Sequence, residues 1–364
     1  MNDVVNHDNV DLLTFLIYFL RHYTMMTEAL LLMKRNIIRF AAFALTGFLL
    51  LQAASFFFRG SYWFSRGFIY DRTARLAAFD TETPGQIDVL NLGDSLSICA
   101  LSPLELFRDY GITSYNLGQD MQFPVESYYA LKHALKTQPI KVVLLETNAI
   151  FYENSLADEG VKTLSESLQS LFPFLRYHNL WKIPFMKKSI RSYFKGYTIN
   201  EIERPFTYDK EYDFNNTTVY YPIARQQLFQ LKRIQKLCED YGITLILYSS
   251  ASIMNYYTMR KHNTLIDICR ENGIHFIDAN YDIASVNVNW ETDTWDNGDH
   301  LNLSGCRKMT AYLGDRLRAT VNDLPDHRSD PLYVSWTEMY QDYLAEVEKM
   351  EGKNYSMIEN ELRH

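Results

Sequence analysis

Three glycines, each placed between a helical pattern and a β-type run, constrain the fold of this chain more than any other feature. They are Gly111, Gly242 and Gly273, and an isoleucine follows each of them. A glycine just past a helix adopts the left-handed backbone that other residues avoid. The β-type runs after them cover residues 113–116, 244–249 and 275–277. This repeated order predicts parallel strands that are connected through helices.

Two further apolar runs, residues 88–92 and 141–146, complete the predicted sheet. The helical patterns between the runs cover residues 125–136, 223–239, 258–271 and 304–321. We therefore expect an α/β fold of three layers, a parallel sheet with helices on both faces. In such a sheet the catalytic groups collect at the carboxyl ends of the strands.

Two segments depart from the alternation of strands and helices. Residues 150–222 are rich in Phe, Tyr and Trp, and helical patterns over 164–172 and 186–194 predict a helical insertion. This insertion would cover the sheet edge or the site, and aromatic core filling explains its composition equally well. The chain turns polar after Asp323, and an amphipathic pattern over 335–350 predicts a C-terminal helical tail across residues 326–364.

The N-terminal part holds a stretch without charge, residues 40–58. As a helix its 19 residues span about 29 Å, close to the hydrocarbon thickness of a bilayer. We expect a transmembrane anchor over residues 36–58, after a cytoplasmic segment, 1–35, and before a linker, 59–84. The alternative is a cleaved signal peptide, with Ala53-Ala54-Ser55 as the cleavage site.

One anchor followed by about 300 residues indicates the topology, because long domains translocate largely regardless of flanking charge. We expect a single-pass protein of the cell membrane whose main domain is extracellular. The first 32 residues are either a cytoplasmic extension or an artefact of the gene model, since Met33 directly precedes Lys34 and Arg35.

Composition excludes several functions. The net charge is −8, and no Lys/Arg block is dense enough to follow a phosphate backbone, which argues against nucleic-acid binding. The four cysteines lie far apart, with no Cys-x-x-Cys pair. That spacing predicts free thiols rather than a zinc site or a disulfide framework. We expect neither a metal nor another cofactor.

The run 88–92 ends in Gly93-Asp94-Ser95, and a helical pattern begins near residue 102. A serine at a strand-to-helix turn exposes its hydroxyl, and the helix N-terminus favours developing negative charge. Ser95 is therefore our candidate nucleophile, although a helix N-cap serine would look the same. A serine also needs a base to become nucleophilic.

His300 is the candidate base, because it alone of nine histidines lies in an Asp-rich loop directly before a helix. Asp296 or Asp299 could orient its ring. Gly118 and Asn148 follow predicted strands, so a backbone N–H and a side-chain amide could stabilise an oxyanion there. Each residue has an ordinary reading as a surface or turn residue. Together they predict acyl transfer through a serine.

These stretches resemble the four blocks of the SGNH, or GDSL-type, hydrolase superfamily over an α/β domain at residues 85–325. The resemblance implies that Ser95 is the nucleophile, that Gly118 and Asn148 form the oxyanion hole, and that His300 is the base. The family has an orienting Asp three residues before its His.

Two positions depart from the family pattern. Position 297, three residues before His300, is Asn, so Asp296 is our first choice for the orienting carboxylate and Asp299 the fallback. The third block usually reads Gly-x-Asn-Asp, whereas residues 146–149 read Glu-Thr-Asn-Ala.

A finer resemblance is to membrane-anchored SGNH proteins of Gram-positive bacteria. The anchor and the tracts 114–119, 143–147 and 299–302 look like the D-alanyl-lipoteichoic acid biosynthesis family and related partners of membrane-bound O-acyltransferases. The resemblance implies transfer or removal of acyl groups on cell-surface glycans or teichoic-acid-type polymers. A membrane-bound O-acyltransferase would then be a partner, and no cofactor is implied.

Two other functions compete with this one. In the first, the domain is a catalytically inactive SGNH-like binding module that partners a membrane O-acyltransferase. In the second it is a lipase or general esterase, which would need an open apolar pocket. Geometry discriminates between an active and a decayed site. An active site should place His300 Nε2 within hydrogen-bond reach of Ser95 Oγ, and a carboxylate at His300 Nδ1.

Overall fold

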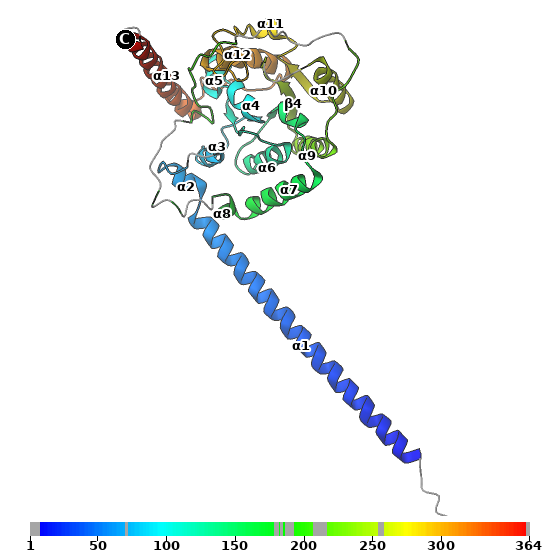
Figure 1. Ribbon diagram of the computed structural model, residues 1–364. Helices are drawn as coiled ribbons and strands as arrows, with labels where there is room; N and C mark the ends of the chain where they lie inside the picture. The colour runs from blue at the N-terminus through cyan, green and yellow to red at the C-terminus, as the bar shows by residue number, and fades with distance from the viewer. Residues whose placement is uncertain are drawn as a thin grey trace, which may run out of the picture. The chain divides into compact units, whose positions relative to one another are not determined.

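The computed structural model describes residues 8–69, 72–177, 182, 185, 193–206, 217–253 and 258–361. The chain divides into two compact units, residues 1–57 and residues 58–364. The described part of the first unit is one helix, and the second unit is an α/β domain (Figure 1).

Helix α1 (Asp8–Phe57) has 50 residues and is about 75 Å long. It is continuous because no glycine or proline occurs before Gly47. In the part of the chain that the structure describes, α1 is the one helix that is long and apolar enough to cross a membrane. Residues 36–57 of the expected anchor, 36–58, and residues 8–35 of the expected cytoplasmic segment, 1–35, thus lie in the same helix.

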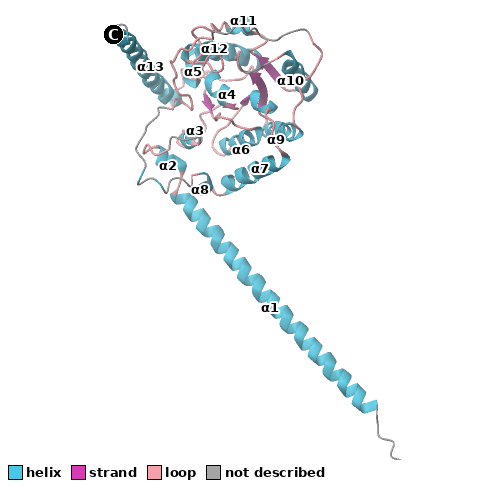
Figure 2. Ribbon diagram, viewed as in Figure 1, coloured by secondary structure: helices cyan, strands magenta, loops and turns pink. Residues whose placement is uncertain are grey.

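The α/β domain is built on five parallel strands (Figure 2). In chain order they are β1 (Val89–Leu92), β2 (Ser114–Asn116), β3 (Val142–Glu146), β4 (Thr244–Ser249) and β5 (His275–Asp278). Their order in the sheet is β2-β1-β3-β4-β5, and every neighbouring pair is parallel. The order reverses between β1 and β3, which is where ligands bind in open sheets of this kind.

Helices cover both faces of the sheet, as expected (Figure 1). One face packs on α6 (Pro124–Ala134), α9 (Arg225–Tyr241) and α10 (Met259–Asn272). The other face packs on α5 (Pro103–Tyr110), α11 (Ile283–Val286) and α12 (Leu303–Thr320). Strands buried on both faces need apolar residues at successive positions, which explains the apolar runs in the sequence.

The three glycines act as expected. Gly111, Gly242 and Gly273 end α5, α9 and α10 with φ angles of 67°, 67° and 65°. Each therefore turns the chain from a helix into the next strand or its approach.

The expected linker over residues 59–84 is wrong. These residues form α2 (Gly60–Phe64) and α3 (Ala74–Phe79), which belong to the α/β domain. Leu76 and Phe79 of α3 are buried in the main core, and Phe79 contacts the ring of Tyr115 edge-on. Burial of the apolar side chains of α3 stabilises the folded domain, so this segment is part of the core and not a linker.

The aromatic insertion is helical at its start. It contains η1 (Asn148–Phe151), α7 (Leu156–Leu171) and α8 (Pro173–Arg176). Helix α7 begins earlier than expected because Ser155 caps it, accepting a hydrogen bond from the Asp158 N–H at 3.1 Å. The expected helix over 186–194 lies almost entirely outside the described residues. Lys195 lies at the sheet edge, where its carbonyl accepts the Asn116 N–H of β2 at 2.9 Å.

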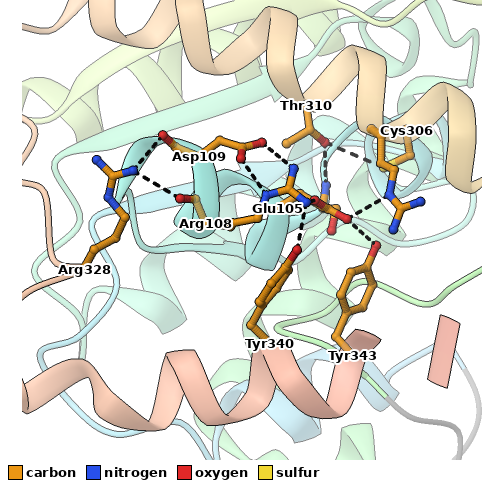
Figure 3. Close-up of polar contacts among 10 residues, drawn as sticks. Glu105, Arg108, Asp109, Cys306, Thr310, Arg328, Tyr340 and Tyr343 are labelled. Atoms are coloured by element: carbon orange, nitrogen blue, oxygen red, sulfur yellow. Dashed lines mark hydrogen bonds and ion pairs between the residues drawn. The ribbon is translucent and has the colours of Figure 1, made fainter. Parts of the chain in front are cut away.

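The C-terminal tail packs on the domain. After η3 (Pro331–Tyr333), α13 (Val334–Glu361) buries Trp336 and Tyr343 completely. Tyr343 donates its hydroxyl to the buried Glu105 carboxylate of α5 at 3.0 Å (Figure 3). Arg108 and Arg307 also contact that carboxylate, at 2.5 and 2.9 Å. The tail is thus held by a buried, charge-assisted network.

Candidate active site

The turn after β1 presents Ser95. Ser95 is the first residue of α4 (Ser95–Ala100), a short helix that precedes the one expected near residue 102. Asp94 caps α4 by accepting a hydrogen bond from the Leu96 N–H at 2.9 Å. Gly93 has a φ of 136°, and a Cβ there would lie 2.7 Å from the Glu146 Cβ. Only glycine fits this turn, which therefore fixes the position of the serine.

Ser95, His300 and Asp296 form an unbroken chain of hydrogen bonds. His300 Nε2 lies 2.7 Å from Ser95 Oγ, and His300 Nδ1 lies 2.5 Å from Asp296 Oδ2. Asp296 Oδ1 also accepts the backbone N–H of His300 at 2.7 Å. With its Nδ1 proton directed at a carboxylate, the neutral ring leaves Nε2 free to accept the serine proton.

Asp299, the fallback carboxylate, lies beside His300 but is not part of this chain of hydrogen bonds. Its Oδ2 is 3.4 Å from His300 Nδ1, and its Oδ1 accepts a hydrogen bond from Ser252 Oγ at 3.2 Å. The structure therefore brings the first-choice carboxylate, Asp296, to the histidine at hydrogen-bond distance.

The loop before His300 explains why the carboxylate is at 296. Asn297 and Gly298 both have positive φ, 64° and 97°, and the Gly298 N–H donates to Thr294 Oγ1 at 3.1 Å. Asn and Gly are the residues that adopt this conformation most readily. Position 297 thus suits the turn, and the turn brings the residue four positions before His300 to its ring.

The charges around His300 raise its pKa. Burial alone would lower that pKa, but the hydrogen bond to Asp296 and the negative charges of Asp299 and Asp296 outweigh this effect. Burial raises the pKa of Asp299, and the Asp296 charge adds to the rise. His300 is therefore a stronger base than an ordinary histidine.

Both expected oxyanion donors lie beside the nucleophile turn, and both have acceptors within the protein. Asn148 Nδ2 donates to Asp94 Oδ2 at 2.7 Å, and the same amide nitrogen also donates to Tyr152 Oη at a longer 3.4 Å. The Gly118 N–H makes a long hydrogen bond of 3.3 Å to Asn116 Oδ1. A Cβ on Gly118 would lie 2.1 Å from Ser97 Oγ, so only glycine fits. The Ser95 N–H, at the start of α4, has no partner within that helix.

A buried acidic group beneath the turn was not found from the sequence. Tyr152 donates to Asp94 Oδ2 at 2.5 Å, beside the Asn148 amide. Glu146, at the end of β3, accepts the Asn148 N–H at 2.8 Å. Burial and the nearby Asp94 charge raise the Glu146 pKa well above its usual value. The one signal available was the acidic residue in the third block, at position 146.

Ser95 and His300 open into a cavity of about 780 Å³. Trp295 lines it and lies against His300, with ring centroids 5.5 Å apart. Residues 197–202 of the insertion supply one wall, and Glu346 and Met350 of α13 line the cavity as well. The insertion therefore covers both the sheet edge and the cavity.

Asp296, Asp299 and His300 are also the one set within the described ranges that could hold a metal ion, with ligand atoms within 4.8 Å of one another. His300 directs one ring nitrogen to Asp296 and the other to Ser95. A cation here would compete with those contacts.

Comparisons with known proteins find only distant similarity for this chain. No family model matches it, and no curated protein does. It is similar to a solved structure of a lipolytic protein of the G-D-S-L family from Desulfitobacterium hafniense, at 13% identity and a TM-score of 0.34, over 63% of this chain and 98% of that one. An acylhydrolase from Bacteroides fragilis matches at 13% identity and a TM-score of 0.36, over 69% and 99% of the two chains.

A GDSL-like lipase from Bacteroides thetaiotaomicron matches at 12% identity and a TM-score of 0.35, over 69% of this chain and 97% of that one. None of the three is described as a lipoteichoic acid biosynthesis protein. Similarity this distant carries no functional argument.

Proposed function

We propose that this protein is a serine-dependent acyl-transfer enzyme. The observation that carries the proposal is the chain from Ser95 Oγ through His300 to Asp296, with distances of 2.7 and 2.5 Å. A serine hydroxyl is a weak nucleophile until an oriented base removes its proton. The elements that hold this chain, the turn after β1 and the loop before α12, join groups 205 residues apart in the sequence.

In the proposed reaction, Ser95 Oγ attacks the acyl carbonyl while His300 Nε2 takes the hydroxyl proton. Asp296 stabilises the imidazolium that forms. The negative charge on the carbonyl oxygen is stabilised by the N–H groups of Ser95 and Gly118 and by the Asn148 N–H whose contact with Tyr152 Oη is long, 3.4 Å. Collapse expels the alcohol, which takes the proton from His300 and leaves an acyl-serine.

The second half-reaction decides between an esterase and a transferase. Water or an acceptor hydroxyl gives its proton to His300 and attacks the acyl-serine, which frees Ser95. An enzyme that excludes water from the acyl-serine becomes a transferase. The walls from the insertion and α13 suit that purpose, because they line the cavity into which Ser95 opens.

The finer part of the proposal concerns place and substrate. Helix α1 would anchor the domain on the outside of the cell membrane. The acyl group would then be moved to or from cell-envelope glycans or teichoic-acid-type polymers, with a membrane-bound O-acyltransferase as partner. The support for this part is the apolar helix and the resemblance stated above.

One observation favours the alternative of an inactive binding module. The Asn148 amide already donates to both Asp94 and Tyr152, and the Gly118 N–H already donates to Asn116. If these contacts persist with substrate bound, the oxyanion loses two of its three donors.

Turnover of a neutral aryl ester by the full-length chain tests the proposal. We expect Ser95→Ala and His300→Ala each to abolish turnover while the melting temperature stays unchanged. The matched control is His133→Ala, because His133 also contacts a carboxylate, Asp80 at 2.5 Å, but does not line the cavity. Retained turnover in either site variant would contradict the assignment.

A further inference from the structure

On helix α7, apolar side chains are exposed and carboxylates are buried, which is the reverse of an ordinary surface helix. Five apolar side chains are 41–75% exposed, namely Leu156, Val161, Leu164, Leu168 and Leu171. Two carboxylates on the same helix, Glu159 and Glu166, are buried, at 6% and 8% exposed. A surface helix ordinarily buries its apolar stripe and exposes its charges.

The buried side of α7 is fixed by satisfied polar contacts. Glu159 accepts hydrogen bonds from Gln230 of α9 at 2.7 Å and from Asn154 at 2.9 Å. Glu166 pairs with Arg176 of α8 at 2.7 Å. Rotating α7 to bury its leucines would leave these groups without partners, at a cost of several kcal/mol. The outward direction of the leucines is therefore a property of the fold.

The outward side is one continuous apolar face. At about 100° per residue, Val161, Leu164 and Leu168 lie within an arc of about 60°. The charged residues of α7 all lie outside that arc, in the same helical projection. We call Val161, Leu164 and Leu168 the α7 face. Apolar patches of this kind mark sites of interaction.

The α7–α8 segment lies where the chain enters the domain after α1. Phe58, the residue after α1, packs on Phe174 of α8, with ring centroids 5.3 Å apart. Gly60 lies so close to the ring of Tyr177 that a Cβ would be 2.3 Å from Cζ. Figure 1 shows α2, α8 and α7 as neighbours in the α/β domain. The residues that directly follow α1 thus pack on the α7–α8 segment.

We propose that the α7 face inserts into the headgroup–acyl boundary of the membrane that α1 spans. The proposal rests on α1 being a membrane anchor and is independent of the acyl-transfer chemistry. A helix with an apolar side and a charged side binds at that depth, in the plane of the interface. The occupant is lipid because Phe58, the first residue after α1, packs on α8, so the chain passes directly from the anchor to the α7–α8 segment.

The experiment uses the full-length chain in nanodiscs of phosphatidylcholine and phosphatidylglycerol. Leu164→Cys and Leu168→Cys each carry a nitroxide, and electron paramagnetic resonance measures its collisions with oxygen and with a water-soluble nickel chelate. The matched control is Ile266→Cys on α10, an exposed apolar position, 44% exposed, outside the α7 face. All three positions are exposed, so the substitutions leave the core intact.

The native cysteines give little background. Cys238, Cys269 and Cys306 are buried, and burial raises the pKa of each thiol to about 12. Cys99 is partly buried, and burial raises its thiol pKa to about 12 as well. The chain without an added cysteine, carried through the same labelling, measures any signal that remains.

We expect the labels at 164 and 168 to collide more with oxygen and at least threefold less with the nickel chelate than the label at 266. Nickel collisions equal to those at 266 would show that the face is in water and would overturn the proposal. Low collisions with both reagents would show that protein covers the face, from a second copy or a partner, and would overturn it equally.

Discussion

Replacing Asp296 by Asn tests the hydrogen-bond chain most selectively. The carboxylate makes two contacts with His300, at 2.5 Å to Nδ1 and 2.7 Å to the backbone N–H. An amide of the same size can donate to Nδ1, which favours the tautomer with its proton on Nε2. That tautomer cannot accept the proton of Ser95. In serine proteases the equivalent change lowers kcat by about 10⁴-fold.

We therefore expect Asp296→Asn to lower kcat by about 10³- to 10⁴-fold, equivalent to about 4–5.5 kcal/mol of barrier. Asp299→Asn is the matched control, because that carboxylate lies 3.4 Å from Nδ1, outside good hydrogen-bond distance. It should cost less than about tenfold, because a nearby charge without a good hydrogen bond contributes little beside a partly open surface. Initial rates with an aryl ester measure both variants. Equal losses in the two variants, or a small loss in Asp296→Asn, would refute the reasoning.

Three further predictions follow from the same contacts. The raised pKa of His300 means that kcat/KM should fall as pH decreases, with a midpoint above the ordinary histidine value of 6.5, because only the neutral ring accepts the serine proton; a pH–rate profile measures it. Asn148→Ala should lower kcat by about 10²- to 10³-fold, since it removes an oxyanion donor, as single-turnover rates would show. Trp336→Ala should lower the free energy of unfolding by about 3–5 kcal/mol, because this fully buried ring packs on Phe107 with ring centroids 5.4 Å apart. Urea denaturation measures this loss.

For each of these three predictions, one result would contradict it. A midpoint at or below 6.5 would mean that the neighbouring carboxylates do not act on His300. Unchanged single-turnover rates in Asn148→Ala would mean that its amide stays with Asp94 throughout the reaction. Glu338→Ala on the same helix is the control for Trp336→Ala, and equal losses in both would refute the specific packing of α13.

The sheet could be predicted because its signals are local. Strands β1 and β3 are buried on both faces, so nearly every position is apolar, and glycine ends the helices before β2, β4 and β5. The segment over 59–84 was missed because α2 and α3 have only 5 and 6 residues. Helices this short show no complete period, and tertiary burial alone stabilises them.

The site could be predicted only in part, because some of its contacts join residues that are far apart in the sequence. Ser95 and His300 could be identified from the local sequence around a turn. The choice of Asp296 over Asp299 followed from the family spacing. The contact of Tyr152 with Asp94, 58 positions apart, has no local pattern that would reveal it. The same holds for Glu346 of α13 in the wall of the cavity. Such contacts depend on how distant elements pack.

Covalent labelling of the full-length chain with a fluorophosphonate, followed by peptide mass spectrometry, tests the central claim most directly. The reagent reacts with serines that a base has activated. We expect one labelled peptide that carries the phosphonate on Ser95, and we expect the label to disappear in His300→Ala. A folded protein that takes no label at Ser95, or takes it equally well without His300, would contradict the claim that this chain activates a serine.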